Sequence, residues 1–303
     1  MTVLFGIAFS PISLYFSFRF VPSMPIAPER SRAVFQKLEC DLIKLSAKPQ
    51  AKSVHRFRTG TRRVQILLGE LSPKTGGREK KLLKLLGRIR KRAGKLRDLD
   101  VQLTALRSLK IPREPRRKTQ LVNHLIELRG QQERKLRKAA EEANLGEIRK
   151  RLKRAAKRFN PEASRDPLAA AKAILRRIED QGSPVTEAVL HQCRILSKRA
   201  RYAAEFAAPS PEAAQFIAEL KKIQDALGDW HDWLTLTQTA IEQLGEVRES
   251  PLSAELHNVT GAKFRHAVAV LSHMRAKMAA NIAPTPRAPR ASAKMAGAAV
   301  TAA

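Results

Sequence analysis

Cysteine is nearly absent from this sequence, which contains only Cys40 and Cys193 among 303 residues. Two cysteines that lie far apart exclude a small secreted scaffold held by disulfides, and they exclude a zinc site built from thiolates. Aromatic residues make up only 5% of the chain, and so few rings disfavour a protein that binds single strands by stacking bases. The sequence also lacks a glycine-rich loop that would cradle phosphates and a nucleophile elbow.

Acidic residues are scarce as well, with 28 Asp and Glu against 58 Lys and Arg and a formal net charge of +30. Such a surface repels itself, so its natural partner is a polyanion: a nucleic acid, an anionic membrane or a polymeric phosphate. Hydrophobic residues make up 43% of the chain, which is enough to bury a core. The composition therefore predicts a folded, strongly basic protein.

No stretch alternates with the period of a strand, and apolar residues recur at helical spacing between the prolines. A proline inside a helix costs about 3 kcal/mol, so prolines mark helix ends and starts. They leave eight helical segments, at 31–47, 50–72, 76–110, 114–158, 168–181, 185–208, 211–247 and 252–280. With the boundary placed at 160–161, we predict an all-α protein of two four-helix bundles, residues 29–160 and 161–280, related by an internal pseudo-twofold repeat.

The two ends of the chain differ from the predicted bundles. Residues 1–28 begin with a mostly apolar stretch that Pro11 interrupts and that no basic residue precedes, and this stretch is short for a membrane span. We interpret 1–28 as an extension outside the fold, with a membrane anchor or signal peptide as the alternative. Residues 281–303 are rich in Ala, Pro, Arg and Lys without periodicity, which predicts a disordered basic tail.

An internal repeat relates the two halves. When His55 is aligned with His191, the basic residues of the first copy fall on basic residues of the second, and the aspartates Asp98 and Asp232 follow 43 and 41 residues after their histidines. Matching residues at nearly matching separations indicate a duplication. The aligned basic pairs are Arg58 with Arg194, Arg62 with Lys198, and Arg63 with Arg199.

Each repeated segment is amphipathic when it is drawn as a helix. Phe57, Val64 and Leu67 fall on one side of the first copy, and the basic residues fall on the opposite side. Cys193 takes the position of Phe57, which predicts a reduced core residue. The candidate binding residues are Lys52, His55, Arg58, Arg62 and Arg63 in the first copy and His191, Arg194, Lys198, Arg199 and Arg201 in the second.

This spacing suits a flexible row of anionic tetrahedra. Arg offers a planar fork that grips two phosphate oxygens, and Lys adds a point charge. Cations at i, i+3/i+4 and i+7 repeat along a helix face at about 5–10 Å, so that one strand touches several in succession. Histidine adds a donor, and we expect its protonated form near a polyanion. A merely solvated charged face is the alternative for any one helix.

Three motifs resemble the CHAD family, the conserved-histidine α-helical domain. They are His-x-x-Arg-x-x-x-Arg-Arg at 55–63, Arg-Asp-Leu-Asp at 97–100 and Leu-His-x-x-Arg-Ile-x-x-Lys-Arg-x-Arg-Tyr at 190–202. The resemblance spans about residues 29–280. It implies two four-helix bundles that bind inorganic polyphosphate in a basic groove, and association with polyphosphate granules. Gln65 and the His231-Asp232 pair depart from the family pattern.

A second basic segment and several metal-like patterns carry weaker signals. Residues 78–97 form an amphipathic segment whose cations are second candidates, namely Arg88, Arg90, Lys91, Lys95 and Arg97. Asp98 and Asp100 lie in so basic a run that we expect them to pair with arginines rather than a metal. His266 and His273 lack an evident third ligand. We therefore predict no catalytic residues, no metal and no cofactor.

The expected function is non-enzymatic binding of inorganic polyphosphate in the cytoplasm, at polyphosphate granules. The alternative is a basic helical protein that binds or compacts DNA or RNA non-specifically, although we see no recognition helix. A phosphate-chain hydrolase would require an acid/base or metal constellation that the sequence does not reveal. We expect no obligatory membrane partner, and the sequence leaves the oligomeric state and the preferred chain length open.

Overall fold

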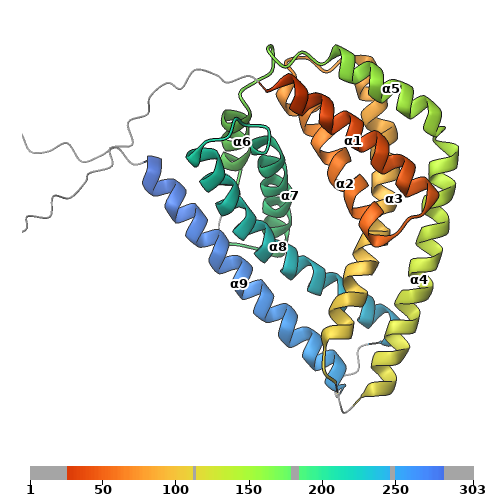
Figure 1. Ribbon diagram of the computed structural model, residues 1–303. Helices are drawn as coiled ribbons and strands as arrows, with labels where there is room; N and C mark the ends of the chain where they lie inside the picture. Colours follow the sequence, from red (N-terminus) through yellow and green to blue (C-terminus); the bar gives the residue numbers. More distant parts are fainter. Residues whose placement is uncertain (1–25, 112–113, 179–183, 246–249, 283–303) are drawn as a thin grey trace, which may run out of the picture.

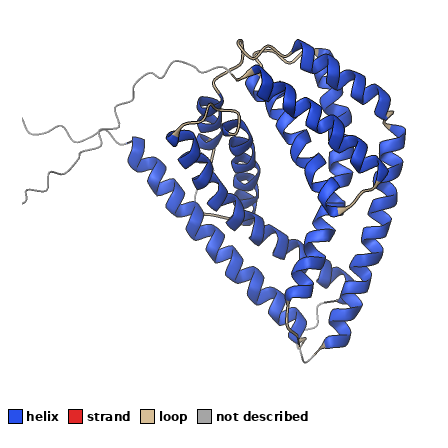
Figure 2. Cartoon of the chain, in the orientation of Figure 1, coloured by secondary structure: helices blue, strands red, loops and turns tan. Residues whose placement is uncertain are grey.

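Helices are the only regular structure in the described part of the computed structural model, which covers residues 26–111, 114–178, 184–245 and 250–282 (Figure 1, Figure 2). The all-α prediction is confirmed. The helices of the first half are α1 (Pro28–Ala47), α2 (Ala51–Ile66), α3 (Gly77–Ser108), α4 (Pro115–Glu142) and α5 (Leu145–Arg158). Those of the second half are α6 (Pro167–Arg176), α7 (Glu187–Ala204), α8 (Pro211–Leu244) and α9 (Pro251–Ile282).

Prolines start five of the described helices, as the sequence predicts. A proline occupies the first position of α1, α4, α6, α8 and α9, where its missing N–H interrupts no helical hydrogen bond. Side chains also cap helix starts, at α8 and at α7, which begins with Glu187 rather than proline. The hydroxyl of Ser210 accepts a hydrogen bond from the N–H of Ala213, and the hydroxyl of Thr186 accepts one from the N–H of Val189.

The fourth predicted segment, 114–158, is wrong as a single helix. The chain turns at Asn144, which adopts a left-handed conformation with φ 48°, and its side chain accepts a hydrogen bond from the N–H of Glu147 at the start of α5. Asparagine tolerates this conformation better than most residues. No proline marks the break, so proline punctuation alone could not find it.

The break at Asn144 lets α5 complete the first bundle. Helices α1 and α3 each pack against both α2 and α5, so four helices surround one core (Figure 1). In the second half α6 packs on α7, α7 on α8 and α8 on α9. The far halves of the long helices form a further cluster, made of residues such as Leu103 (α3), Leu125 (α4), Leu236 (α8) and Leu256 (α9).

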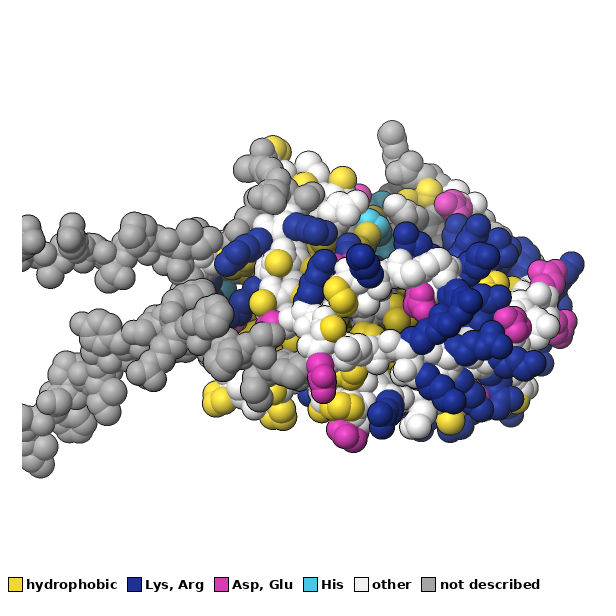
Figure 3. Space-filling view, turned by 90° about the horizontal axis from the view of Figure 1, so that it is seen from above, with side chains coloured by type: hydrophobic (Ala, Val, Ile, Leu, Met, Phe, Trp, Pro, Cys, Tyr) yellow, Lys and Arg dark blue, Asp and Glu magenta, His cyan; other side chains and the backbone are white. Residues whose placement is uncertain are grey.

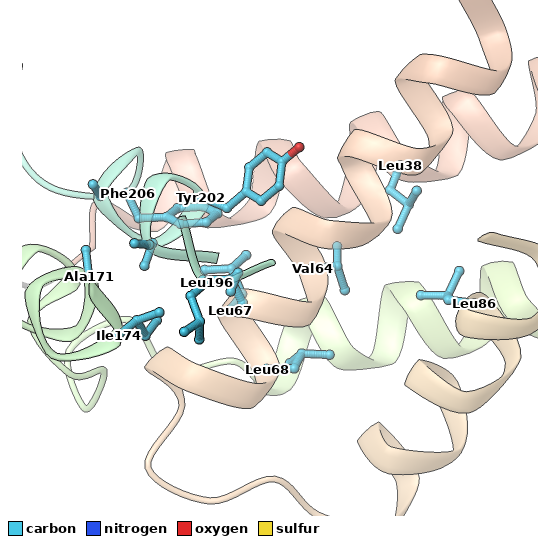
Figure 4. Close-up of a cluster of buried hydrophobic side chains, with 14 of the residues drawn as sticks. Leu38, Val64, Leu67, Leu68, Leu86, Ala171, Ile174, Leu196, Tyr202 and Phe206 are labelled. Carbon is cyan, nitrogen blue, oxygen red and sulfur yellow. The ribbon is translucent and has the colours of Figure 1, made fainter. Parts of the chain in front are cut away.

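The main core is continuous between the halves. One cluster of buried side chains includes Leu38, Val64 and Leu86 of the first half with Ile174 and Leu196 of the second. Figure 4 shows Leu67, which directly follows α2, close to Leu196 of α7. The predicted boundary at 160–161 falls in the loop between α5 and α6, and that loop is pinned to the first half, since the N–H of Arg165 donates to the carbonyl of Leu71 at 2.8 Å.

Helix α2 ends in a π-helical turn, η1 (Leu67–Leu71), closed by a hydrogen bond from the N–H of Ser72 to the carbonyl of Leu67 at 2.9 Å. All three leucines of this turn are buried, and Leu67 and Leu68 belong to the core that Figure 4 shows. The same turn carries Glu70 towards the second half, where it meets Arg199. The wider turn thus serves the contact between the halves.

The fold begins earlier than residue 29. Ile26 is only 1% exposed and belongs to the main core, so the expectation that all of 1–28 lies outside the fold is wrong for its last residues, because an apolar side chain there packs into the core. The predicted extension over 1–25 lies outside the described residues. So does the predicted tail from 283 onwards, while α9 continues to Ile282.

Candidate polyanion-binding site

Helices α2 and α7 present the predicted basic faces. Each buries its apolar side, with Phe57 and Val64 of α2 and Cys193 and Ala200 of α7 fully inside the core. Cys193 is a free thiol, as predicted, and burial raises its pKa. The basic residues emerge on the other sides. None of the predicted binding residues is buried: Lys52, His55 and His191 are exposed, and Arg58, Arg62, Arg63, Arg194, Lys198, Arg199 and Arg201 are half-buried.

One ion pair occurs in both halves at the positions that the sequence repeat aligns. Arg58 of α2 pairs with Asp98 of α3 at 3.3 Å, and Arg194 of α7 pairs with Asp232 of α8 at 3.9 Å. Arg58 also donates to the carbonyl of Gly94 at 3.3 Å. These contacts hold both guanidinium groups against the following helix. They also agree with the expectation that the aspartates pair with arginines, as does the 2.8 Å pair between Asp100 and Arg129.

The basic residues of the two halves lie close enough to act on one another. Burial, together with the charges of Arg194, Arg62 and Arg58, lowers the pKa of Lys198 to about 7. Burial also lowers the pKa of Arg194, and the charges of Arg62 and Arg58 in the other half lower it as well. Arg58, Arg62, Arg194 and Lys198 therefore form one group of cations, which we call the central cluster. Asp98 and Asp232 both lie within its field.

The histidines flank the central cluster. Burial and then the charges of Arg97, Arg58 and Arg201 lower the pKa of His55. The ring of His191 meets the ring of His231 edge-on, with 5.5 Å between centroids. Burial, Arg194, His191 and Lys198 lower the pKa of His231 to about 3. Without an anion, His55 and His231 are thus held towards the neutral form, in contrast to the protonated histidine expected beside a ligand.

Two predicted binding residues hold the halves together. Arg63 of α2 pairs with Glu205 at the end of α7, at 2.9 Å, and Arg199 of α7 pairs with Glu70 of η1. Arg201 adds a longer pair to Glu205, at 3.6 Å. The arginines at aligned positions therefore reach in opposite directions across the contact between α2 and α7. Sequence reasoning missed Glu70 and Glu205, although one acid follows each repeated basic row by a similar distance.

The second candidates on α3 divide into two groups. Arg88, Lys91 and Lys95 are exposed, whereas Arg90 and Arg97 are half-buried. Burial, Arg62 and Arg58 lower the pKa of Arg90, so Arg90 adjoins the central cluster, while Arg97 acts on His55. In the second half, the position aligned with Arg90 is Gln224, whose side chain donates a hydrogen bond to the carbonyl of Ser197 at 2.8 Å.

The described residues contain neither a cluster suited to a metal ion nor a helix suited to span a membrane. Over the described ranges, no group of three or more His, Cys, Asp and Glu side chains is placed to hold a metal ion. In that same part of the chain, no helix has the length and apolarity needed to cross a bilayer.

The fold and the site define an all-helical protein in which basic residues of the two halves come together where α2 packs against α7. The chain belongs to the CHAD domain family, whose model matches residues 32–240. The resemblance that the sequence motifs indicate is thereby confirmed.

Two solved structures share this fold. The crystal structure of the CHAD domain from the plant Ricinus communis aligns with a TM-score of 0.57 at 17% identity, covering 86% of this chain and 94% of that one. PptA from Streptomyces chartreusis aligns with a TM-score of 0.59 at 16% identity, covering 85% of this chain and 100% of that one. Among curated proteins, no sequence matches the chain significantly.

Proposed function

We propose that this protein binds linear inorganic polyphosphate at the central cluster without chemically changing it. The observation that carries the proposal is the convergence of Arg58, Arg62, Arg194 and Lys198, contributed by two helices of different halves. Two aspartates share that field, so the cations outnumber the anions around them. A polyphosphate segment supplies the missing negative charge as a continuous row.

The chemistry of the cluster fits a narrow, flexible anion. The side chain of Arg194 is only 14% exposed and that of Arg58 only 20% exposed, so both guanidinium groups are partly desolvated, and their contacts to phosphate gain strength from the lower dielectric. Exposed His55, His191 and Lys52 extend the contact beyond the cluster. Arg90 and Arg97 add charge from α3.

Several features support binding without turnover. Arg58 and Arg194 pair with Asp98 and Asp232, and a cation beside a carboxylate makes it a weaker base. The pKa of Asp232 is raised by burial, and the groups that act on it are Arg194, Lys198 and two other carboxylates, Asp98 and Asp229. By family resemblance, we place this binding in the cytoplasm at polyphosphate granules.

The decisive experiment removes the charge of the central cluster. In a central variant, Arg58, Arg62, Arg194 and Lys198 are each replaced by Gln, which keeps helix propensity. Since each charged contact contributes on the order of 1 kcal/mol, affinity for polyphosphate should fall about 100- to 1,000-fold. The slope of log affinity against log salt should become shallower by about three.

A matched control removes four charges elsewhere. Arg107, Lys110, Arg116 and Arg265 are exposed and have no ion-pair partner among the described residues, so their replacement by Gln gives a control variant of equal net charge. The proposal fails if both variants lose affinity equally. It also fails if duplex DNA displaces polyphosphate at equal phosphate concentration, which would favour a nucleic-acid-binding function, or if the protein releases phosphate when Mg²⁺ is added.

A further inference from the structure

Helix α5 has the highest proportion of basic residues among the described helices. Its 14 residues include seven Lys and Arg and a single acid, Glu147. Figure 3 shows Lys and Arg side chains gathered over the part of the molecule where α5 and the neighbouring helices lie. The exposed cations of α5 are Arg149, Lys150, Lys153, Arg154, Lys157 and Arg158.

Only part of this charge is neutralised. Arg149 and Lys153 share Glu39 of α1, at 2.8 and 3.7 Å, and Arg151 pairs with Glu147 at 2.8 Å. No ion pair within the described ranges involves the remaining four exposed cations, Lys150, Arg154, Lys157 and Arg158.

These four cations lie on one face of the helix. Their spacing of i, i+4, i+7 and i+8 aligns them over about 12 Å. Like charges at i and i+4 repel, and each such pair destabilises a helix by a few tenths of a kcal/mol. A bound anionic chain would relieve that repulsion, and we call the four residues the α5 row.

The α5 row points away from the central cluster. Because α1 and α3 each pack against both α2 and α5, α2 and α5 lie across the first bundle from one another (Figure 1). Helix α2 faces α7, whereas the α5 row faces solvent. A straight segment of an anionic chain that lies on the central cluster therefore does not continue onto the α5 row.

The opposite side of α5 is used by the core. Ile148, Leu152 and Ala155 are buried in the main cluster. An interfacial membrane helix must place its apolar face in the lipid, but the apolar face of α5 is already buried in the protein core. The chemistry of the row thus favours a hydrated, flexible polyanion over a bilayer.

We propose that the α5 row is a second phosphate-chain-binding surface, so that one protein molecule bridges two polyphosphate segments. This inference takes its ligand from the proposed function, and it adds a second, separate site. Bridging follows because the two surfaces face different directions and each carries at least four cations. Long chains would then be cross-linked by the protein rather than merely coated by it.

The test counts bound ligands by native mass spectrometry. The probe is an oligophosphate with an extended length below about 20 Å, the width of two packed helices, which prevents one ligand from covering both surfaces. An α5 variant replaces Lys150, Arg154, Lys157 and Arg158 with Gln. Wild type and the control variant should bind two ligands, and the α5 variant and the central variant should each bind one.

The outcomes separate the two proposals. If the α5 variant still binds two ligands, the second site is overturned while the proposed function stands. If the central variant binds two ligands with wild-type affinity, the central site is overturned. Circular dichroism must show each variant to be as helical as wild type.

A second measurement tests bridging itself. With long-chain polyphosphate, light scattering should rise for wild type and the control variant and stay at baseline for the α5 variant. Scattering of the α5 variant equal to that of wild type would overturn bridging. Bridging would also be overturned if the α5 variant still cross-linked polyphosphate chains but no longer bound vesicles of phosphatidylserine and phosphatidylcholine. In that case α5 would be a membrane contact.

Discussion

At the scale of single residues, Lys198 shows that the folded protein disfavours positive charge in the central cluster. An ordinary lysine keeps its proton up to a pKa near 10.5, whereas burial and three neighbouring arginines lower this pKa to about 7. Between these two values the unfolded chain holds a proton that the folded protein has released. Stability attributable to Lys198 therefore increases as the pH rises from 7 to 10.5 and is lost as the pH falls through 7.

The same residue predicts a proton uptake on binding. Phosphate oxygens favour the charged ammonium, so polyphosphate should raise the pKa of Lys198, and at pH 8 binding should take up a proton at this position. The affinity should accordingly weaken as the pH rises above 7. Calorimetry in two buffers of different ionisation enthalpy measures the uptake. In Lys198→Arg, whose charge does not titrate, the uptake should drop by most of one proton; an unchanged value would contradict this account.

At the scale of elements, the helix ends and the contacts between aligned helices decide where the cations go. The clasp formed by Arg63 with Glu205 and by Arg199 with Glu70 joins α2 and α7. These half-buried pairs align the two basic rows, and they also occupy two arginines that would otherwise face a ligand. The bend between α4 and α5 has a different role, since it closes the first bundle with α5 and turns the α5 row outwards.

The bend predicts a specific ranking of substitutions at Asn144. Replacement by Ala removes the side-chain cap at Glu147 and forces a left-handed conformation on a residue that disfavours it, so unfolding free energy should fall by about 1–2 kcal/mol. Replacement by Gly loses the cap but accepts the conformation, so its loss should be smaller. Urea denaturation of the two variants compares them, and a Gly variant less stable than the Ala variant would contradict the explanation.

At the scale of the whole molecule, the net charge of +30 opposes folding until anions arrive. Raising the ionic strength from about 0.05 to about 0.5 M shortens the screening length from above 10 Å to below 5 Å. The melting temperature should therefore rise with salt in the absence of ligand.

Polyphosphate should raise the melting temperature further at low salt. This second increase should be nearly lost at high salt, because binding releases counterions. Scanning calorimetry over a matrix of salt and ligand tests both parts. A melting temperature that falls steadily with added salt would mean that attractive ion pairs outweigh the repulsion.

Much of this organisation follows from the sequence alone. Helical periodicity and the proline positions determined the all-α class and most helix ends, because both act within a few residues along the chain. The repeat aligned Arg58 with Arg194 and Asp98 with Asp232, and the structure places the same ion pair at both sites. The side of α2 and α7 that carries the cations was equally predictable, since it is set by residue spacing.

Only the tertiary structure decided which charges meet. The proximity of Arg62 to Lys198, the pairing of Arg63 with Glu205, and the separation of the α5 row from the central cluster depend on how helices pack far apart in sequence. The turn at Asn144 also depends on tertiary structure, because the cost of its left-handed conformation is offset only when α5 packs into the core. Local pattern determines which face of a helix is basic, but long-range packing determines which face lies opposite it.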